Sequence, residues 1–190
     1  MQNMYNAYFV AYAPKKFETF SYYWGEEKKF LCYITTKRRN GIEDIIPLVV
    51  SKNMKNKLSN IKKKVEFYGR ICTKSVLQED GKRHLKVFVM VEKICQADDD
   101  ACDRNSIYIQ NAYVCKKQIM DRKVDIIIAT NYKLNPSAYI PVVARNDNAV
   151  KISHIPIGSE IKITARFQSR EYVKRDVKKI TFELFLISIG

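Results

Sequence analysis

The sequence repeats itself at low similarity, and this repeat limits the folds that the chain can adopt. Ile46-Pro47 in "DIIPLVV" corresponds to Ile140-Pro141 in "AYIPVVA", and Gly69-Arg70 corresponds to Ala165-Arg166. The spacing between these anchors agrees within a residue or two in the two halves. Such a pattern indicates two copies of one structural unit of about 90 residues.

Each unit contains five segments that read as short β-strands. In the second unit the expected strands are Ile107–Lys117, Val124–Thr130, Tyr139–Arg145, Glu160–Tyr172 and Lys179–Ile189. A short helix is expected after the third strand, around Lys52–Ile61 in the first unit and Asn146–His154 in the second. Five strands with a helix after the third is the order of an OB-fold barrel. We therefore predict an all-β chain of two tandem five-stranded OB-fold barrels, each with a short helix between strands 3 and 4.

The acidic stretch "QADDDACDR" separates the two units. We expect residues 1–95 to form a first, divergent unit, residues 96–104 to form a linker, and residues 105–190 to form a second unit. The negative charge of the linker fits a solvated connector, or a segment that occupies a basic groove in the free protein. The sequence favours the connector.

The charge balance indicates the class of partner. The 190 residues include 34 basic and 20 acidic side chains, which gives a net charge of +14. This excess favours a polyanion, whether nucleic acid, an anionic membrane surface or an acidic protein, with an ordinary basic protein as the alternative. Neither a membrane-spanning apolar run nor a signal peptide is evident, so we expect a cytoplasmic protein that does not act at membranes.

Little in the sequence indicates catalysis or metal binding. The cysteines are scattered and lack the close pairs of a zinc site, so we expect reduced, mostly buried thiols: Cys32, Cys72, Cys95, Cys102 and Cys115. There is no phosphate-cradling glycine loop and no carboxylate motif for magnesium. We expect a protein that is not an enzyme and that carries no cofactor.

One predicted strand has a distinctive outer face. Within "EIKITARFQSREYVK" the odd-numbered residues from Ile161 to Phe167 are apolar, which leaves the even-numbered ones on the opposite side. That side carries a stripe of cations with one aromatic ring: Lys162, Arg166, Arg170, Tyr172 and Lys174. Phosphates and bases together would suit such a stripe, and an ordinary solvated strand face is the alternative.

Three stretches of the second unit resemble the bacterial single-stranded DNA-binding protein family, especially its tandem OB-fold variety of bacteria and mobile elements. They are "NSIYIQNAYVCKK", "VDIIIATNYKLNPSAYIPVVARNDNA" and "IGSEIKITARFQSREYVKR", in which "YIP" and "QSREY" are the most specific matches. The resemblance covers nearly all of Asn105–Ile189, and the first unit resembles the family only loosely. It implies a protein that coats single-stranded DNA with little sequence preference in replication, recombination or mobile-element transfer.

The resemblance also implies roles for individual residues. Tyr172 and Tyr139 fall where the family carries aromatic residues that stack on bases, and Tyr132 lies near a third such position. Arg166 and Arg170 match arginines of the same motif and would pair with phosphates or stack by their guanidinium planes. Other matched positions depart from the family pattern: Arg145 replaces an aromatic residue, and Ala112 and Ala165 replace glycines.

The first unit has different candidates for contact with a strand. Val76 stands at the position of Tyr172, so that stacking ring is missing. Hairpin segments and one retained arginine provide alternatives, namely Tyr23, Trp24, Lys37, Arg38, Arg39 and Arg70. An aromatic cluster before a turn is equally typical of an ordinary hairpin or a subunit interface.

The sequence is also compatible with two other functions, and it favours self-association. An OB-fold chain of this kind can also be an adaptor that binds another replication protein, or a binder of single-stranded RNA, because the same surface accepts either strand. The last strand of each unit, "KVFVMVEKI" and "TFELFLISI", is apolar on both faces, which favours self-association. We expect a homodimer or another homo-oligomer.

Overall fold

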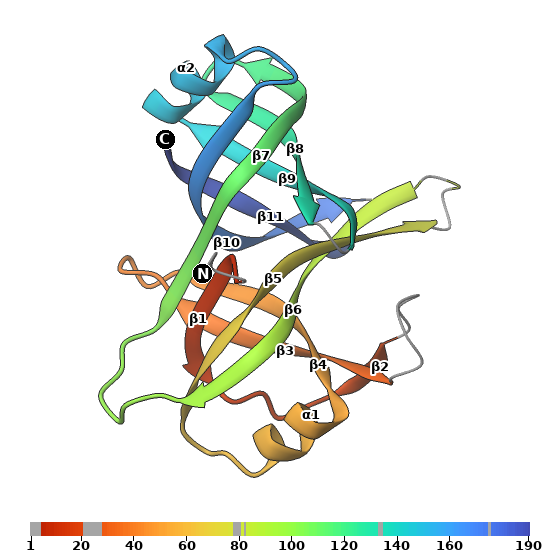
Figure 1. Ribbon diagram of the computed structural model, residues 1–190, viewed down its shortest axis with the longest axis vertical. Helices are drawn as coiled ribbons and strands as arrows, with labels where there is room; N and C mark the ends of the chain where they lie inside the picture. Colours follow the sequence, from red (N-terminus) through yellow and green to blue (C-terminus); the bar gives the residue numbers. More distant parts are fainter. Residues whose placement is uncertain (1–4, 21–27, 78–80, 82, 133–134, 175) are drawn as a thin grey trace. The chain divides into compact units, whose positions relative to one another are not determined.

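The computed structural model describes residues 5–20, 28–77, 81, 83–132, 135–174 and 176–190, and these residues are mostly in β-strands (Figure 1). The prediction of an all-β fold is therefore confirmed. The chain divides into two compact units. Unit 1 comprises Met1–Ile71 and Phe88–Asn105, and unit 2 comprises Cys72–Val87 and Ser106–Gly190.

The first half of the chain contains six strands and one helix in its described residues. In chain order they are β1 (Ala7–Tyr12), β2 (Glu18–Phe20), β3 (Lys29–Lys37), β4 (Glu43–Ser51), α1 (Lys52–Ser59), β5 (Lys64–Leu77) and β6 (Arg83–Gln96). β1 pairs with β5, and β6 runs between β5 and β4, parallel to β4. β3 joins the other side of β4 and is followed by the short strand β2, which the sequence did not predict.

The second half contains five strands and one helix in its described residues. They are β7 (Arg104–Met120), β8 (Lys123–Tyr132), β9 (Asn135–Arg145), α2 (Asp147–His154), β10 (Glu160–Lys174) and β11 (Val177–Ile189). Neighbours in the sheet follow the order β7, β8, β9, β11, β10, and β10 pairs again with β7. The sheet of unit 2 is therefore closed on itself, with β9 and β11 parallel.

The alternating pattern of the sequence produces the core. The odd-numbered residues of β10 that were expected to face inward are buried, which confirms that prediction: Ile161, Ile163, Ala165 and Phe167. In unit 1 the fully buried rings of Phe9 and Phe67 lie opposite each other on β1 and β5. Burial of these rings and of the aliphatic side chains around them is the main contribution to the stability of each unit.

The two helices follow β4 and β9. α1 begins after Ser51, whose hydroxyl accepts a hydrogen bond from the backbone N–H of Met54 at 3.3 Å and so caps the helix. α1 buries Leu58 and packs on β3 and β4. α2 buries Ala149 and Ile152 and packs on β8, β9 and β11.

The expectation of mostly buried thiols is wrong. Cys32 is buried and burial raises the pKa of its thiol to about 12, but Cys102 and Cys115 are exposed and the other two cysteines are half-buried. Cys115 points outward because it follows buried Val114 in the regular alternation of β7.

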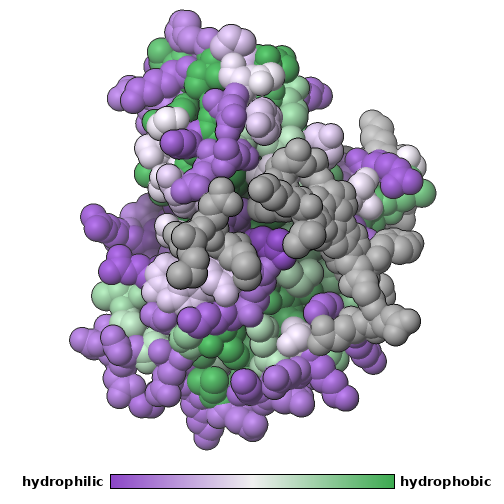
Figure 2. Space-filling view, viewed as in Figure 1, coloured by the Kyte–Doolittle hydropathy of each residue, from purple (hydrophilic) through white to green (hydrophobic). Residues whose placement is uncertain are grey.

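The surface is mostly hydrophilic, as expected for a chain with 34 basic and 20 acidic side chains. Hydrophilic side chains predominate on the face shown in Figure 2, with small apolar areas between them. None of the described helices is long and apolar enough to cross a membrane.

Candidate nucleic-acid interface

The polar side of β10 forms one surface with its hairpin partner β11. In the antiparallel register Arg166 lies opposite Phe185, Arg170 opposite Thr181, and Tyr172 opposite Lys179. Arg170 is exposed, and 40% of the Tyr172 side chain is accessible. We call this surface the β10–β11 face and define it by Arg166, Gln168, Arg170, Tyr172, Lys179, Thr181, Glu183 and Phe185.

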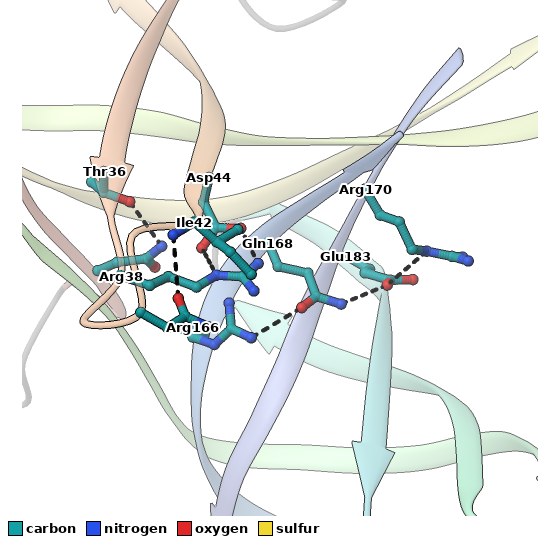
Figure 3. Close-up of polar contacts among 10 residues, drawn as sticks. Thr36, Arg38, Ile42, Asp44, Arg166, Gln168, Arg170 and Glu183 are labelled. Atoms are coloured by element: carbon teal, nitrogen blue, oxygen red, sulfur yellow. Dashed lines mark hydrogen bonds and ion pairs between the residues drawn. The ribbon is translucent and has the colours of Figure 1, made fainter. Parts of the chain in front are cut away.

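Two hydrogen bonds and one ion pair connect the arginines of the β10–β11 face to one carboxylate (Figure 3). Arg166 Nη2 donates to Gln168 Oε1 at 3.2 Å, and Gln168 Nε2 donates to Glu183 Oε1 at 2.7 Å. Arg170 Nε lies 3.7 Å from the same Glu183 oxygen. Glu183 is only 9% exposed. This buried carboxylate therefore orients the two arginines and cancels one of their charges.

Arg166 has a second constraint. Its guanidinium carbon lies 4.4 Å from the centre of the Phe185 ring, which is a cation–π contact. The planar guanidinium is held against that ring, where it can present its edge to a phosphate. Sequence analysis missed Phe185 and Glu183 because both come from the neighbouring strand. Pairing "RFQSR" with "TFELF" around the hairpin turn would have found them.

Tyr108 on β7 extends the aromatic part of this surface. It is exposed and lies opposite Thr164, two residues before Arg166 on β10. Sequence analysis did not consider this residue. Tyr139 on β9 is also exposed. It lies three residues before Val142, which pairs with Leu184 of β11.

Two predicted residues lie away from these tyrosines. Arg145 is the last residue of β9, six residues beyond Tyr139, which is about 20 Å along an extended strand. Lys162 is close to the start of β10, ten residues from Tyr172. Both side chains are exposed, so they add to the positive field without joining the aromatic residues.

Four predicted residues cannot be placed with their side chains. Tyr132 is the last residue of β8 and Lys174 the last residue of β10, but their side chains lie outside the described part of the structure. Tyr23 and Trp24 also lie outside the described residues.

Two of the three unit 1 arginines that the sequence singled out, Arg38 and Arg70, are engaged in ion pairs. Arg38 Nε donates to Asp44 Oδ2 at 2.7 Å and Nη2 donates to Oδ1 of the same fully buried carboxylate (Figure 3). This hydrogen bonding raises the pKa of Arg38. Arg70 pairs with Glu92 on β6. The two neighbours of Arg38 in this turn, Lys37 and Arg39, are exposed and better placed to meet a phosphate.

A cluster of tyrosines in unit 1 has an internal role. The rings of Tyr8 and Tyr68 lie 4.9 Å apart, and that of Tyr5 lies 5.9 Å from Tyr68. Glu66 accepts hydrogen bonds from the hydroxyls of Tyr8, at 3.1 Å, and Tyr68, at 2.7 Å. The bond to Glu66 raises the pKa of Tyr68, and burial raises the pKa of Tyr8. These contacts stabilise the β1–β5 pair.

The fold is similar to that of solved DNA-binding proteins. The wild-type single-stranded DNA-binding protein from Thermus aquaticus superposes with a TM-score of 0.72, covering 97% of this chain and 90% of that chain at 10% identity. A deletion mutant of the same protein gives a TM-score of 0.67, 97% and 92% coverage and 11% identity. No family model and no curated protein sequence matches the chain. At such low identity, the likeness shows a shared fold.

Proposed function

We propose that the protein binds single-stranded DNA with little sequence preference, through two OB-fold barrels at residues 1–95 and 105–190. The observation that carries this proposal is the β10–β11 face, where Arg166 and Arg170 alternate with the exposed ring of Tyr172. The same fold in the Thermus aquaticus single-stranded DNA-binding protein supports it. Closed strand order with parallel β9 and β11 is what an OB-fold barrel requires in unit 2.

The chemistry of this face suits a single strand. Every base has an aromatic face, so Tyr172, Tyr139 and Tyr108 can stack on bases without reading their identity, each stack contributing about 1–3 kcal/mol. Arg166 and Arg170 supply charge-assisted hydrogen bonds to phosphate oxygens. In a duplex the base faces are covered by neighbouring pairs, so the aromatic part of this binding energy is available only from single strands.

A biological setting is part of the same proposal. We propose that the protein coats and protects single strands in the cytoplasm during replication, recombination or transfer of a mobile element, as a homodimer or another homo-oligomer. It does so without catalysis and without a cofactor, because coating requires only reversible binding.

A titration with a fluorescent dT oligomer of about 40 nucleotides tests the proposal. Tyr172→Ala should weaken binding by about 5- to 150-fold, the equivalent of one lost stack of 1–3 kcal/mol. Tyr113→Ala is a matched control, since Tyr113 is 38% exposed but lies beside Glu160, at the start of β10. It should change affinity less than twofold.

Three outcomes would change the conclusion. A wild-type protein that fails to bind dT even at low salt would refute the proposal and favour an adaptor for another replication protein. Preferential binding of a matched U oligomer would turn it into an RNA binder. Unchanged binding in Tyr172→Ala would keep the function and refute the assignment of the site.

A further inference from the structure

Unit 1 contains an open groove whose lining residues are separate from the β10–β11 face. Its volume is about 990 Å³, and its lining comes from the end of β1, from β3 and the turn after it, and from the segment that leads into β7. Among the lining residues six are basic and two acidic, with Lys15, Lys37, Arg39 and Arg104 exposed. We call this the unit 1 groove.

Two tyrosines of the groove are exposed to an extent that core packing does not account for. Tyr12 is 65% exposed at the end of β1, and Tyr33 is 45% exposed in the middle of β3. Tyr12 lies opposite Lys64 on β5, whose ammonium is 5.4 Å from the centre of the ring. A surface that interleaves open rings with cations is what a single strand needs.

An acidic side chain already occupies one edge of this groove. Asp103 Oδ2 accepts a hydrogen bond from the backbone N–H of Lys37 at 2.8 Å, and Oδ1 lies 2.7 Å from Lys64 Nζ. The bond to Asp103 raises the pKa of Lys64. Nearby, Asp99 pairs with Lys63 at 2.6 Å, and Lys64 Nζ donates to the carbonyl of Ala101 at 2.9 Å. The acidic connector is therefore bound to unit 1.

The donors that hold Asp103 are those that a phosphate would use. A backbone N–H and an ammonium converge on one oxyanion, which is the arrangement of many phosphate sites. The carboxylate is covalently attached, so it occupies this position whenever no strand competes for it. A strand with many phosphates can displace it, because each further phosphate meets another cation of the groove.

We propose that the unit 1 groove is a second single-strand-binding site, in which Tyr12 and Tyr33 stack on bases and Asp103 holds the position of a phosphate. This inference rests on the proposed function and deepens it. It assigns a strand-binding role to unit 1 through Tyr12, Tyr33 and the cations around Asp103. Of these cations, the sequence analysis had singled out only Lys37, Arg38 and Arg39.

Binding titrations with variants of the full chain test whether Tyr12 and Tyr33 stack on bases. Tyr12→Ala and Tyr33→Ala should each weaken binding of the dT oligomer by about 5- to 150-fold, in the wild-type and the Tyr172→Ala background alike. Tyr113→Ala again serves as the control. Circular dichroism melting would verify that each variant is folded, as expected for exposed side chains. Unchanged affinity in both folded variants would overturn the inference.

A second measurement does not depend on variants. Photo-crosslinking of the wild-type protein to an oligomer containing 5-bromodeoxyuridine, followed by mass spectrometry, should give adducts on peptides with Tyr12 or Tyr33. Adducts on the Tyr172 peptide alone would overturn the unit 1 groove and leave the proposed function intact. Absence of binding to any oligomer would instead refute the proposed function itself.

The position of Asp103 has its own test. Asp103→Asn removes the charge and keeps the shape, so it should tighten dT binding at low salt by removing a competitor of the phosphate. Asp121→Asn, at an exposed turn of unit 2, changes the net charge equally and is the matched control. A larger gain in Asp103→Asn supports the assignment. Equal gains, or a gain in the control alone, would overturn it.

Discussion

At the scale of single residues, Glu183 controls the charge of the β10–β11 face. Its carboxylate accepts from Gln168 and pairs with Arg170, whose side chain is half exposed. Ion pairs with an exposed partner contribute about 0–1 kcal/mol, so the loss of orientation on breaking this pair is small. The charge that Glu183 cancels acts directly on any phosphate bound to the same face. The effect of Glu183 on the charge of the face should therefore outweigh its effect on the orientation of Arg170.

Glu183→Gln should tighten dT binding at low salt, because Arg170 is released and the face gains one positive charge. The variant keeps an amide oxygen that can accept from Gln168, so its stability should fall by only about 1–3 kcal/mol. Binding titrations and urea unfolding would measure the two effects. Glu171→Gln, exposed at an odd-numbered position of β10, is the control for net charge. Weaker binding in Glu183→Gln would mean that orientation of the arginines matters more than charge.

The residues of this face show what a sequence can and cannot predict. The outward positions of Arg170 and Tyr172 follow from alternation within one strand, and the structure agrees. Tyr108, Glu183 and Phe185 come from adjacent strands, so their place beside Arg166 depends on register between segments far apart or across a hairpin. Arg38 was interpreted as a phosphate ligand because its buried partner Asp44 is not recognisable as buried from the sequence alone.

At the scale of elements, β5 and β10 differ in the space that they leave for a side chain at one corresponding position, Gly69 in β5 and Ala165 in β10. A Cβ on Gly69 of β5 would lie 2.3 Å from the backbone oxygen of Met90 on β6, a contact that no side-chain rotation can relieve. Ala165, the corresponding residue of β10, is fully buried, and the β10–β11 register shifts between Thr164 and Ala165. The repeat predicted that these residues correspond, but not that only one position has room for a methyl group.

Gly69→Ala should therefore destabilise the protein by about 1–3 kcal/mol, as expected for overpacking against backbone. Urea unfolding with the wild type as reference would measure the loss. Gly190→Ala is the control, because a Cβ there meets only Lys162 Cβ at an ordinary 3.9 Å. If Gly69→Ala were as stable as Gly190→Ala, β5 and β6 would have to separate more easily than the structure indicates.

At the scale of the whole molecule, the net charge of +14 attracts any polyanion. This property was readable from composition alone, but composition does not distinguish single strands from duplexes. The distinction depends on exposed rings, since stacking is not screened by salt whereas phosphate pairing is. Affinity and selectivity should therefore respond to salt in opposite directions.

We expect the preference for single-stranded over duplex DNA to grow as salt is added. The log–log salt slope is about −0.9 per neutralised phosphate for duplex and −0.7 for single strands, so with about five contacts selectivity should rise roughly sixfold between 0.05 and 0.3 M. Parallel titrations of dT and a duplex of equal length would measure this. Tyr172→Ala should lose affinity for dT at every salt concentration while its slope stays unchanged. Equal losses of affinity for dT and for duplex in Tyr172→Ala would mean that the ring does not stack on bases, and selectivity would then come from charge alone.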